Sequence, residues 1–275
     1  MSLTHNHIHH YHLFMFEAEN TEVVLVESRG DALWIRLNRP ERRNAYDADM
    51  AERIIAALQD ANRYRSVVIT GVGKGFCAGG SLSTLGTPTP GALRGLYSAS
   101  LRLFDAIRTC PRPVIAAVNG AAAGGGNELV VACDLAIAAR SATFGQTGPR
   151  VGSAPVTGAT NVMSVQIGEK RAKELSFLCR RYTADQALAM GLVNALVDDA
   201  DLESEVATWC SEISKLSPRY LEIAKISSNI WWNGARDSFT NGLGMLIQAI
   251  GSEDMVEGAN AFLDKRPPRF ELHED

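Results

Sequence analysis

Two glycine-rich segments are the strongest candidates for chemistry in this sequence. Gly71–Gly80 (GVGKGFCAGG) directly follows the β-rich run SVVIT, and Gly120–Glu128 (GAAAGGGNE) directly follows PVIAAV. Glycine lets the backbone approach a ligand closely, and ligands commonly bind where the strands of an α/β sheet end. Neither segment matches a phosphate-binding loop or a nucleophile elbow, because the required glycine, serine and threonine positions are not satisfied. Both segments can instead supply free backbone N–H groups.

Two such N–H groups that converge on one point form an oxyanion hole. The hole stabilises the charge that develops on a carbonyl oxygen, and one donor lowers the barrier by ~3 kcal/mol. Glu128 stands just beyond the triple glycine, in a stretch that is otherwise mostly apolar. Its carboxylate is either buried beside the hole or caps a helix, and the residues alone leave both interpretations open.

Composition excludes several other kinds of chemistry. The chain has 275 residues, a net charge of −4 and 46% hydrophobic residues, so it can bury a sizeable core but has no global attraction to nucleic acid or anionic membranes. An anionic ligand must therefore be held by local groups. The six histidines stand only near the two ends, at His5, His7, His9, His10, His12 and His273. The interior therefore cannot build a Ser-His-Asp triad or a histidine-ligated zinc site, and we expect no metal.

The cysteines, the apolar runs and the N-terminal residues indicate the cellular compartment of the protein. Five cysteines without a CxxC pair indicate reduced thiols, and no apolar run approaches the ~20 residues of a membrane span. The first sixteen residues lack the pattern of a signal peptide, so we expect a cytoplasmic protein. His-rich tracts can bind metal. We interpret residues 1–20 as a disordered tail, since chain termini are commonly unanchored.

Strands alternate with helices through most of the chain, which predicts an α/β core with parallel strands over residues 21–200. The expected strands are Glu22–Glu27, Ala32–Leu37, Ser66–Thr70, Pro113–Val118, Leu135–Ala139 and Val193–Val197, with a hairpin turn at Ser28–Asp31. The expected helices of the core are Asp47–Asn62 with Asp47 as N-cap, Leu93–Arg108, Asn127–Cys133, Lys170–Cys179 and Thr183–Met190. Residues 201–275 predict a helical C-terminal region, with helices at Leu202–Lys215, Pro218–Asn229, Arg236–Ile250 and Glu253–Leu263.

A series of ordered motifs resembles the enoyl-CoA hydratase/isomerase (crotonase) superfamily over about Thr21 to Phe270. The motifs are Leu37–Pro40 with Arg43–Ala45, Gly75–Gly80, Pro113–Glu128, Cys133–Leu135, Ala189–Val193 and Ala261–Pro267. The resemblance implies a spiral of ββα turns with a helical C-terminal oligomerisation region, assembled as a homotrimer or hexamer. It also implies an acyl-CoA substrate without a tightly bound cofactor.

The resemblance assigns roles residue by residue. Gly80 and Gly125 would donate to the thioester oxygen, and Glu128 would act as acid or base. The residues that would contact the acyl group are Ala78, Gln146, Thr147, Gly148 and Ser153, with a packing turn as the alternative role of Gln146 and Thr147. The residues that would border coenzyme A are Arg43, Ala45 and Lys74, while Phe262 and Lys265 would reach the coenzyme A of a neighbouring subunit.

The subfamily pattern is mixed. Hydratases resemble this chain at Glu128, but their second carboxylate falls at Gly148, which has no side chain. The stretch Gly145–Ser153 is similar instead to dihydroxynaphthoyl-CoA synthases and 2-ketocyclohexanecarboxyl-CoA hydrolases. In synthases with a Gln-Thr-Gly stretch, bicarbonate can occupy the place of the missing carboxylate. Those enzymes, however, carry an aspartate where this chain has Pro155, a tyrosine near Ile250 and no acid at Glu128.

Three functional hypotheses follow. The first is a hydratase or isomerase that uses Glu128, the second is a ring-forming or ring-opening enzyme, and the third is a catalytically weak acyl-CoA binder. Other residues have structural interpretations: Ser81 and Ser83 favour a helix N-cap over a nucleophile, Asp134 a helix-to-strand junction, and Trp231-Trp232 a helix-packing or subunit contact. The segments 84–96 and 151–162 should shape the acyl pocket.

Overall fold

Two β-sheets form the centre of the molecule in the computed structural model, which describes residues 22–81 and 90–271. The larger sheet has the strand order β1-β2-β3-β5-β7-β10, in which β1 is antiparallel to β2 and the other neighbours are parallel. Its strands are β1 (Val24–Arg29), β2 (Ala32–Leu37), β3 (Ser66–Gly71), β5 (Val114–Val118), β7 (Leu135–Ala139) and β10 (Ala195–Val197). The predicted strands are confirmed to within about two residues. The hairpin turn is tighter than predicted, because Ser28 and Arg29 still belong to β1.

The smaller sheet has the order β4-β6-β8-β9. Its strands are β4 (Gly75–Cys77), β6 (Ala121–Ala123), β8 (Thr143–Gly145) and β9 (Tyr182–Thr183). The chain passes from β3 to β4, from β5 to β6 and from β7 to β8, so that each pair places one strand in each sheet. The helices α2 (Pro90–Thr109) and α3 (Gly125–Ala132) follow the first two pairs. This is the predicted ββα spiral.

The strands of the smaller sheet were not predicted. Two or three residues are too few to show the alternation of a strand, and three of the four strands contain or adjoin glycines. The first glycine-rich segment is therefore not a direct strand-to-helix junction, because β4 lies inside it. The second segment leads directly into the helix α3.

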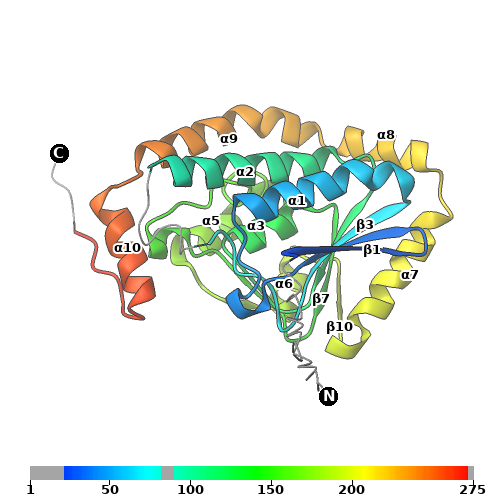
Figure 1. The fold of residues 1–275 in the computed structure, drawn as a ribbon, viewed down its shortest axis with the longest axis horizontal. Helices are drawn as coiled ribbons and strands as arrows, with labels where there is room; N and C mark the ends of the chain where they lie inside the picture. The colour runs from blue at the N-terminus through cyan, green and yellow to red at the C-terminus, as the bar shows by residue number, and fades with distance from the viewer. Residues whose placement is uncertain (1–21, 82–89, 272–275) are drawn as a thin grey trace, which may run out of the picture.

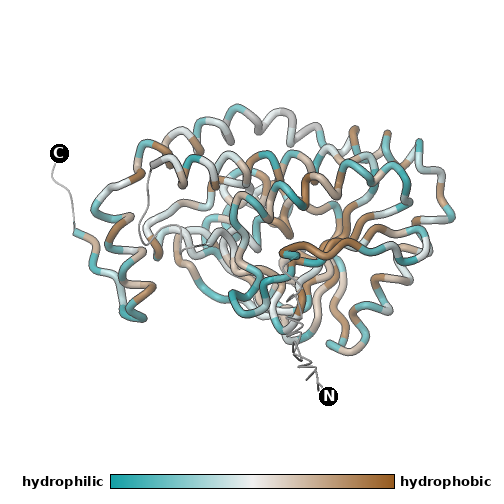
Figure 2. Tube along the Cα trace, in the orientation of Figure 1, coloured by the Kyte–Doolittle hydropathy of each residue, from teal (hydrophilic) through white to brown (hydrophobic). Residues whose placement is uncertain are grey.

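Helices cover both faces of the larger sheet (Figure 1). On one face lie α1 (Ala48–Gln59) and α2, and α9 (Ile230–Gln248) runs over α2; on the other face lies α7 (Leu202–Ser214). Along β3, Val67 and Ile69 belong to the core beneath α1 and α2, whereas Val68 packs with α7. Burial on both faces explains the continuous apolar run of this strand, and Figure 2 shows the strands as the most hydrophobic part of the trace.

The other helices agree with the predictions within two residues at nearly every end. They are α5 (Glu169–Leu178), α6 (Ala184–Met190), α8 (Pro218–Ser228) and α10 (Glu253–Leu263), together with the short α4 (Met163–Ile167), which was not predicted. The predicted N-cap of α1 is confirmed, because the Asp47 side chain accepts the Met50 N–H. The predicted start of α9 at Arg236 is wrong, because this helix begins at Ile230.

Trp232 explains the earlier start of α9. Its ring packs against Phe104 of α2 with 5.0 Å between the ring centroids, and the side chain is buried. This tertiary contact keeps the first turns of α9 on α2 in spite of Gly234. The helix-packing interpretation of Trp232 is therefore confirmed.

Asp134 lies between α3 and β7, as predicted. Its carboxylate accepts the Val114 N–H at 2.8 Å and pairs with Lys225 Nζ at 2.7 Å. Lys225 is buried and also donates to the carbonyls of Ile107 and Arg112, both at 3.0 Å. The pair ties α8 to the spiral.

Other predictions can be compared only with the described residues. All five cysteines are buried and free. Within residues 22–81 and 90–271, no helix combines the length and apolarity needed to cross a membrane. The histidines and Ser83 lie outside the described residues. The division at residue 200 stays a prediction.

Candidate active site

The two glycine-rich segments meet in the folded chain. Gly79 has a positive φ of 90°, and a Cβ at this residue would lie 2.8 Å from the Gly125 nitrogen. A Cβ at Gly126 would lie only 2.0 Å from the Cys77 carbonyl oxygen. The backbone beyond β4 therefore lies directly against the first turn of α3, and this contact requires glycine at both places.

The N–H groups of Gly80 and Gly125 have no hydrogen-bond acceptor among residues 22–81 and 90–271. The Tyr46 N–H donates to the Gly79 carbonyl at 2.9 Å, and Tyr46 accepts the Ser81 N–H at 2.8 Å. In such a parallel bridge, the N–H of the intervening Gly80 points away from Tyr46. Gly125 opens α3, where an N–H has no acceptor within the helix. Neither N–H donates a hydrogen bond within the described chain, and both residues line one cavity.

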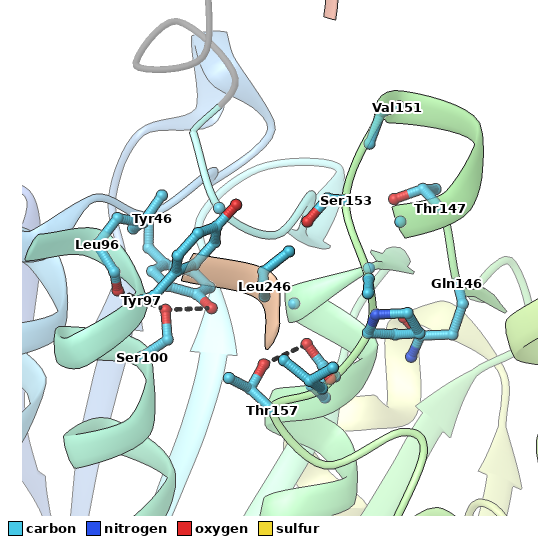
Figure 3. A pocket seen from close by; sticks show the side chains of 18 of the residues that line it. Tyr46, Leu96, Tyr97, Ser100, Gln146, Thr147, Val151, Ser153, Thr157 and Leu246 are labelled. Atoms are coloured by element: carbon cyan, nitrogen blue, oxygen red, sulfur yellow. Dashed lines mark hydrogen bonds between the residues drawn. The ribbon is translucent and has the colours of Figure 1, made fainter. Parts of the chain in front are cut away.

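This cavity lies between α2, α3 and the chain from 146 to 157 (Figure 3). All five residues predicted to contact the acyl group line it, namely Ala78, Gln146, Thr147, Gly148 and Ser153. Tyr97 and Leu246 complete the wall from α2 and α9. Of the two segments expected to shape the pocket, 151–157 does so, and Leu96 is the part of 84–96 that is both described and in the wall.

Glu128 lies in the first turn of α3 and lines the same cavity. Its Oε2 accepts a hydrogen bond from Thr157 Oγ1 at 2.5 Å, and its Oε1 accepts the Ala159 N–H at 3.3 Å. Burial raises the pKa of Glu128 to about 7, and the hydrogen bonds from Thr157 and Ala159 oppose this rise. Of the two interpretations of this carboxylate, burial beside the glycines is correct, since Gly124 is the cap of α3.

No second carboxyl group reaches this cavity from the described residues. At Gly148, a Cβ would lie 3.0 Å from the Ser153 carbonyl oxygen and 3.1 Å from Pro155 Cδ. Residues 153–155 thus occupy the space into which a side chain at 148 would extend. The absence of a carboxylate at this position, expected from the sequence, is therefore accompanied by closer packing of the chain.

Two neighbouring side chains were missed in the sequence. Tyr46 packs beneath Gly125, and its hydroxyl donates to Ser100 Oγ at 3.2 Å; burial, together with the charge of Glu128, raises its pKa, so it stays protonated. Thr157 was noticed only as part of a pocket segment. No local pattern marks either residue, because their contacts span 54 and 29 residues of sequence.

Gln146 and Thr147 lie where the cavity meets a larger outer groove, which both residues also line. The Gln146 side chain is buried, and neither its amide oxygen nor its amide nitrogen has a hydrogen-bond partner. Thr147 Oγ1 packs against Gly124. Unpaired buried amide atoms are rare in native proteins. Whether Gln146 contacts the acyl group or only packs a turn stays a prediction.

The outer groove is bordered by exposed cations, which are Arg43, Lys74, Arg150, Arg180 and Arg181. Arg43 and Lys74 were predicted for this role. The other three were missed as ligand-binding residues, although the adjacent pair at 180 and 181 was a visible signal. Such a cluster can hold a polyanion although the whole chain is acidic.

Asn44 fixes the loop that carries Arg43. Its buried side chain accepts the Arg39 N–H at 2.9 Å and donates to the carbonyls of Val72 and Gly75 at 3.0 and 2.8 Å. Ala45 belongs to this loop and is half-buried, but it does not line the cavity or the outer groove.

Phe262 and Lys265 line a further groove along α10, together with Arg43 and Arg150 of the same chain. Arg43 is thus shared between the two grooves. That Phe262 and Lys265 serve a neighbouring subunit stays a prediction.

Comparison with known proteins agrees with this geometry. The sequence profile for enoyl-CoA hydratase/isomerase matches residues 28–273, and the chain belongs to this family. Its members act on acyl-CoA substrates, which makes an acyl-CoA enzyme the class that fold and site define.

Solved structures of similar proteins cover nearly the whole chain. An enoyl-CoA hydratase from Bacillus anthracis is 33% identical with a TM-score of 0.74, covering 90% of this chain and 99% of that one. A carnitinyl-CoA hydratase from Mycobacterium avium is 31% identical with a TM-score of 0.80, covering 90% and 98%. An enoyl-CoA hydratase/isomerase from Xanthobacter autotrophicus is 28% identical with a TM-score of 0.81, covering 90% and 99%.

Proposed function

We propose that this protein stabilises the enolate of an acyl-CoA thioester and transfers a proton at the α or γ carbon of the acyl group. One observation carries the proposal: the N–H groups of Gly80 and Gly125, which have no acceptor among the described residues, line the same cavity as the Glu128 carboxyl group. Backbone donors aimed at a thioester oxygen stabilise the negative charge of an enolate. A carboxyl group beside them can remove and return the proton.

The ionisation of Glu128 suits this role. With a pKa near 7, the carboxyl group exists in both forms at neutral pH, so it can accept a proton from one carbon and donate it to another. A single such group is sufficient for double-bond isomerisation. Hydration commonly needs a second group, and Gly148 supplies none. The site therefore favours isomerisation over ordinary hydration.

The outer groove supports binding of the coenzyme A part of the substrate. Its exposed cations, above all Arg43 and Lys74, would pair with the phosphates, while the thioester arm would enter past Ala78, Gln146 and Thr147. Assembly as a trimer or hexamer and a cytoplasmic location accompany this proposal as predictions.

Ring-forming or ring-opening chemistry with bicarbonate is the second candidate. The unpaired amide of Gln146 carries it, because the amide N–H is a donor that a small anion would accept beside Gly148. Bound bicarbonate would supply the base that Gly148 lacks. Turnover of acyl-CoA esters that depends on added bicarbonate would favour this candidate.

Solvent deuterium exchange tests the first candidate. A panel of acyl-CoA thioesters is incubated in D₂O with and without bicarbonate, and label in the acyl carbons is measured by mass spectrometry. We expect exchange in the native protein and none in Glu128→Gln, with binding of the CoA ester retained. Glu212→Gln on the exposed face of α7 is the matched control. Exchange that survives in Glu128→Gln would eliminate the assigned role of Glu128.

A further inference from the structure

One short turn, Thr157–Ala159, contacts both oxygens of the Glu128 carboxyl group. Thr157 Oγ1 lies 2.5 Å from Oε2, and the Ala159 nitrogen lies 3.3 Å from Oε1. Both contacts are buried. The Thr157 backbone N–H also stabilises the carboxylate. Because a carboxylate offers about four acceptor sites, it retains acceptor capacity for a substrate.

The turn itself is held firmly. Gly158 has a φ of 134°, and a Cβ there would lie 2.4 Å from the Phe104 ring of α2. The Gly158 carbonyl accepts the N–H groups of Val162 and Met163 at 2.9 and 3.0 Å. The turn that contacts Glu128 is therefore itself held by hydrogen bonds and by packing against α2.

The groups that face Glu128 from the surrounding elements supply no compensating positive charge. They are Tyr46 from the loop before α1 and Tyr97 from α2, while Cys77 of β4 lies near Tyr46, and no Lys or Arg lines the cavity among the described residues. Burial raises the pKa of Tyr46 and of Cys77, so both stay neutral near pH 7. The hydrogen bonds that Thr157 and Ala159 donate are thus the interactions that favour the ionised form of Glu128.

We infer that Thr157 is a positioning residue, which orients Glu128 towards the cavity and favours its ionised form through the hydroxyl hydrogen bond. The inference deepens the proposed function and rests on it for its effect on the reaction. The predicted effect of Thr157 on the ionisation of Glu128 is independent of the proposed function, because this ionisation can be measured separately.

Thr157→Val removes the hydroxyl and keeps the shape of the side chain. Hydrogen bonds to charged groups are the stronger ones, so we expect the acidic limb of the pH–rate profile for deuterium exchange to move upward by about one pH unit. Exchange at pH 6 then falls about tenfold and stays near the native rate at pH 9. Thr157→Ser restores the native profile, and Thr160→Val, at an exposed threonine in the same loop, leaves it unchanged.

A second measurement needs no substrate. The free energy of unfolding of the native protein should decline between about pH 4.5 and 7 as buried Glu128 ionises, and in Thr157→Val this decline should extend to about pH 8. If Thr157→Val does not fold, Thr157→Ala serves in its place. A uniform loss of stability at every pH with an unmoved pH–rate profile would overturn the inference. Absence of exchange in the native protein would refute the proposed function alone, because the unfolding comparison still decides the role of Thr157.

Discussion

The inner cavity and the outer groove of this protein differ in the charge and the burial of the groups that line them. The cavity combines backbone N–H groups with one buried carboxyl group, Glu128, whereas the groove presents exposed cations such as Arg43 and Lys74. Electrostatic interactions are strong where water is excluded and weak where it is present. Under the proposed function, the cavity would perform the chemistry and the groove would provide affinity through several weak contacts.

The two regions also differ in what holds them in place. The cavity is assembled from the end of β4, the first turn of α3 and the turn Thr157–Ala159, which lie far apart in the sequence. The groove depends on loop side chains that reach into solvent. A change in the cavity should therefore lower the rate of the reaction, whereas a change in the groove should mainly weaken binding.

A large loss of turnover is also expected at the backbone donors. In Gly125→Ala the new Cβ would lie 2.7 Å from the Tyr46 hydroxyl, so the first turn of α3 must shift. We expect kcat to fall by ~10²–10³, the range found when one oxyanion-hole donor is lost, with KM little changed. Steady-state kinetics measures both. The double change Tyr46→Phe with Gly125→Ala removes the clashing oxygen and should recover part of kcat, while an unaffected kcat in Gly125→Ala would contradict Gly125 as a donor.

A smaller effect concerns stability and pH. The pKa of Glu128 is about 7 in the folded protein against an ordinary value of 4.5, so the folded state binds the extra proton between these values. Stability therefore declines as pH rises from about 4.5 to 7, by about 3 kcal/mol in total. Glu128→Gln should remove this decline and be the more stable protein at pH 8. Urea unfolding at pH 5 and pH 8 measures it, and equal pH dependence in both proteins would contradict a buried, ionising Glu128.

Arg43 should show a moderate effect on substrate binding and not on turnover. Because it borders both grooves, Arg43→Ala is expected to raise KM for an acyl-CoA about tenfold and to leave kcat nearly unchanged. The loss should shrink as the salt concentration rises, since salt screens exposed charges. Kinetics at low and high ionic strength measure both. A fall in kcat instead of a rise in KM would place Arg43 in the chemistry.

Lys74 should show the smallest effect. It is exposed and lines only the outer groove, so Lys74→Ala is expected to raise KM by about two- to threefold. The same assays compare it with Arg43→Ala. A larger effect for Lys74 than for Arg43 would mean that the phosphates lie nearer to β4 than to α10.

Sequence patterns predicted the elements that are long and periodic. The strands of the larger sheet and α1 with its Asp47 cap were recovered because burial on one or both faces leaves a regular pattern. The strands of the smaller sheet were not recovered, and neither was the start of α9 at Ile230. These elements depend on partners elsewhere in the chain, as Trp232 depends on Phe104, and local sequence does not record such partners.

By itself, the sequence determined which groups are available for chemistry. An interior without histidine excludes imidazole chemistry, two glycine-rich segments offer backbone donors and Glu128 offers a carboxyl group, while the family resemblance marks Gly148 as the place of a missing second one. Only the tertiary structure decided that Gly80, Gly125 and Glu128 line one cavity, that Thr157 holds the carboxyl group, and that burial raises its pKa. Distance, desolvation and hydrogen bonding across 29 residues exist only once the chain is folded, which is why no local pattern could show them.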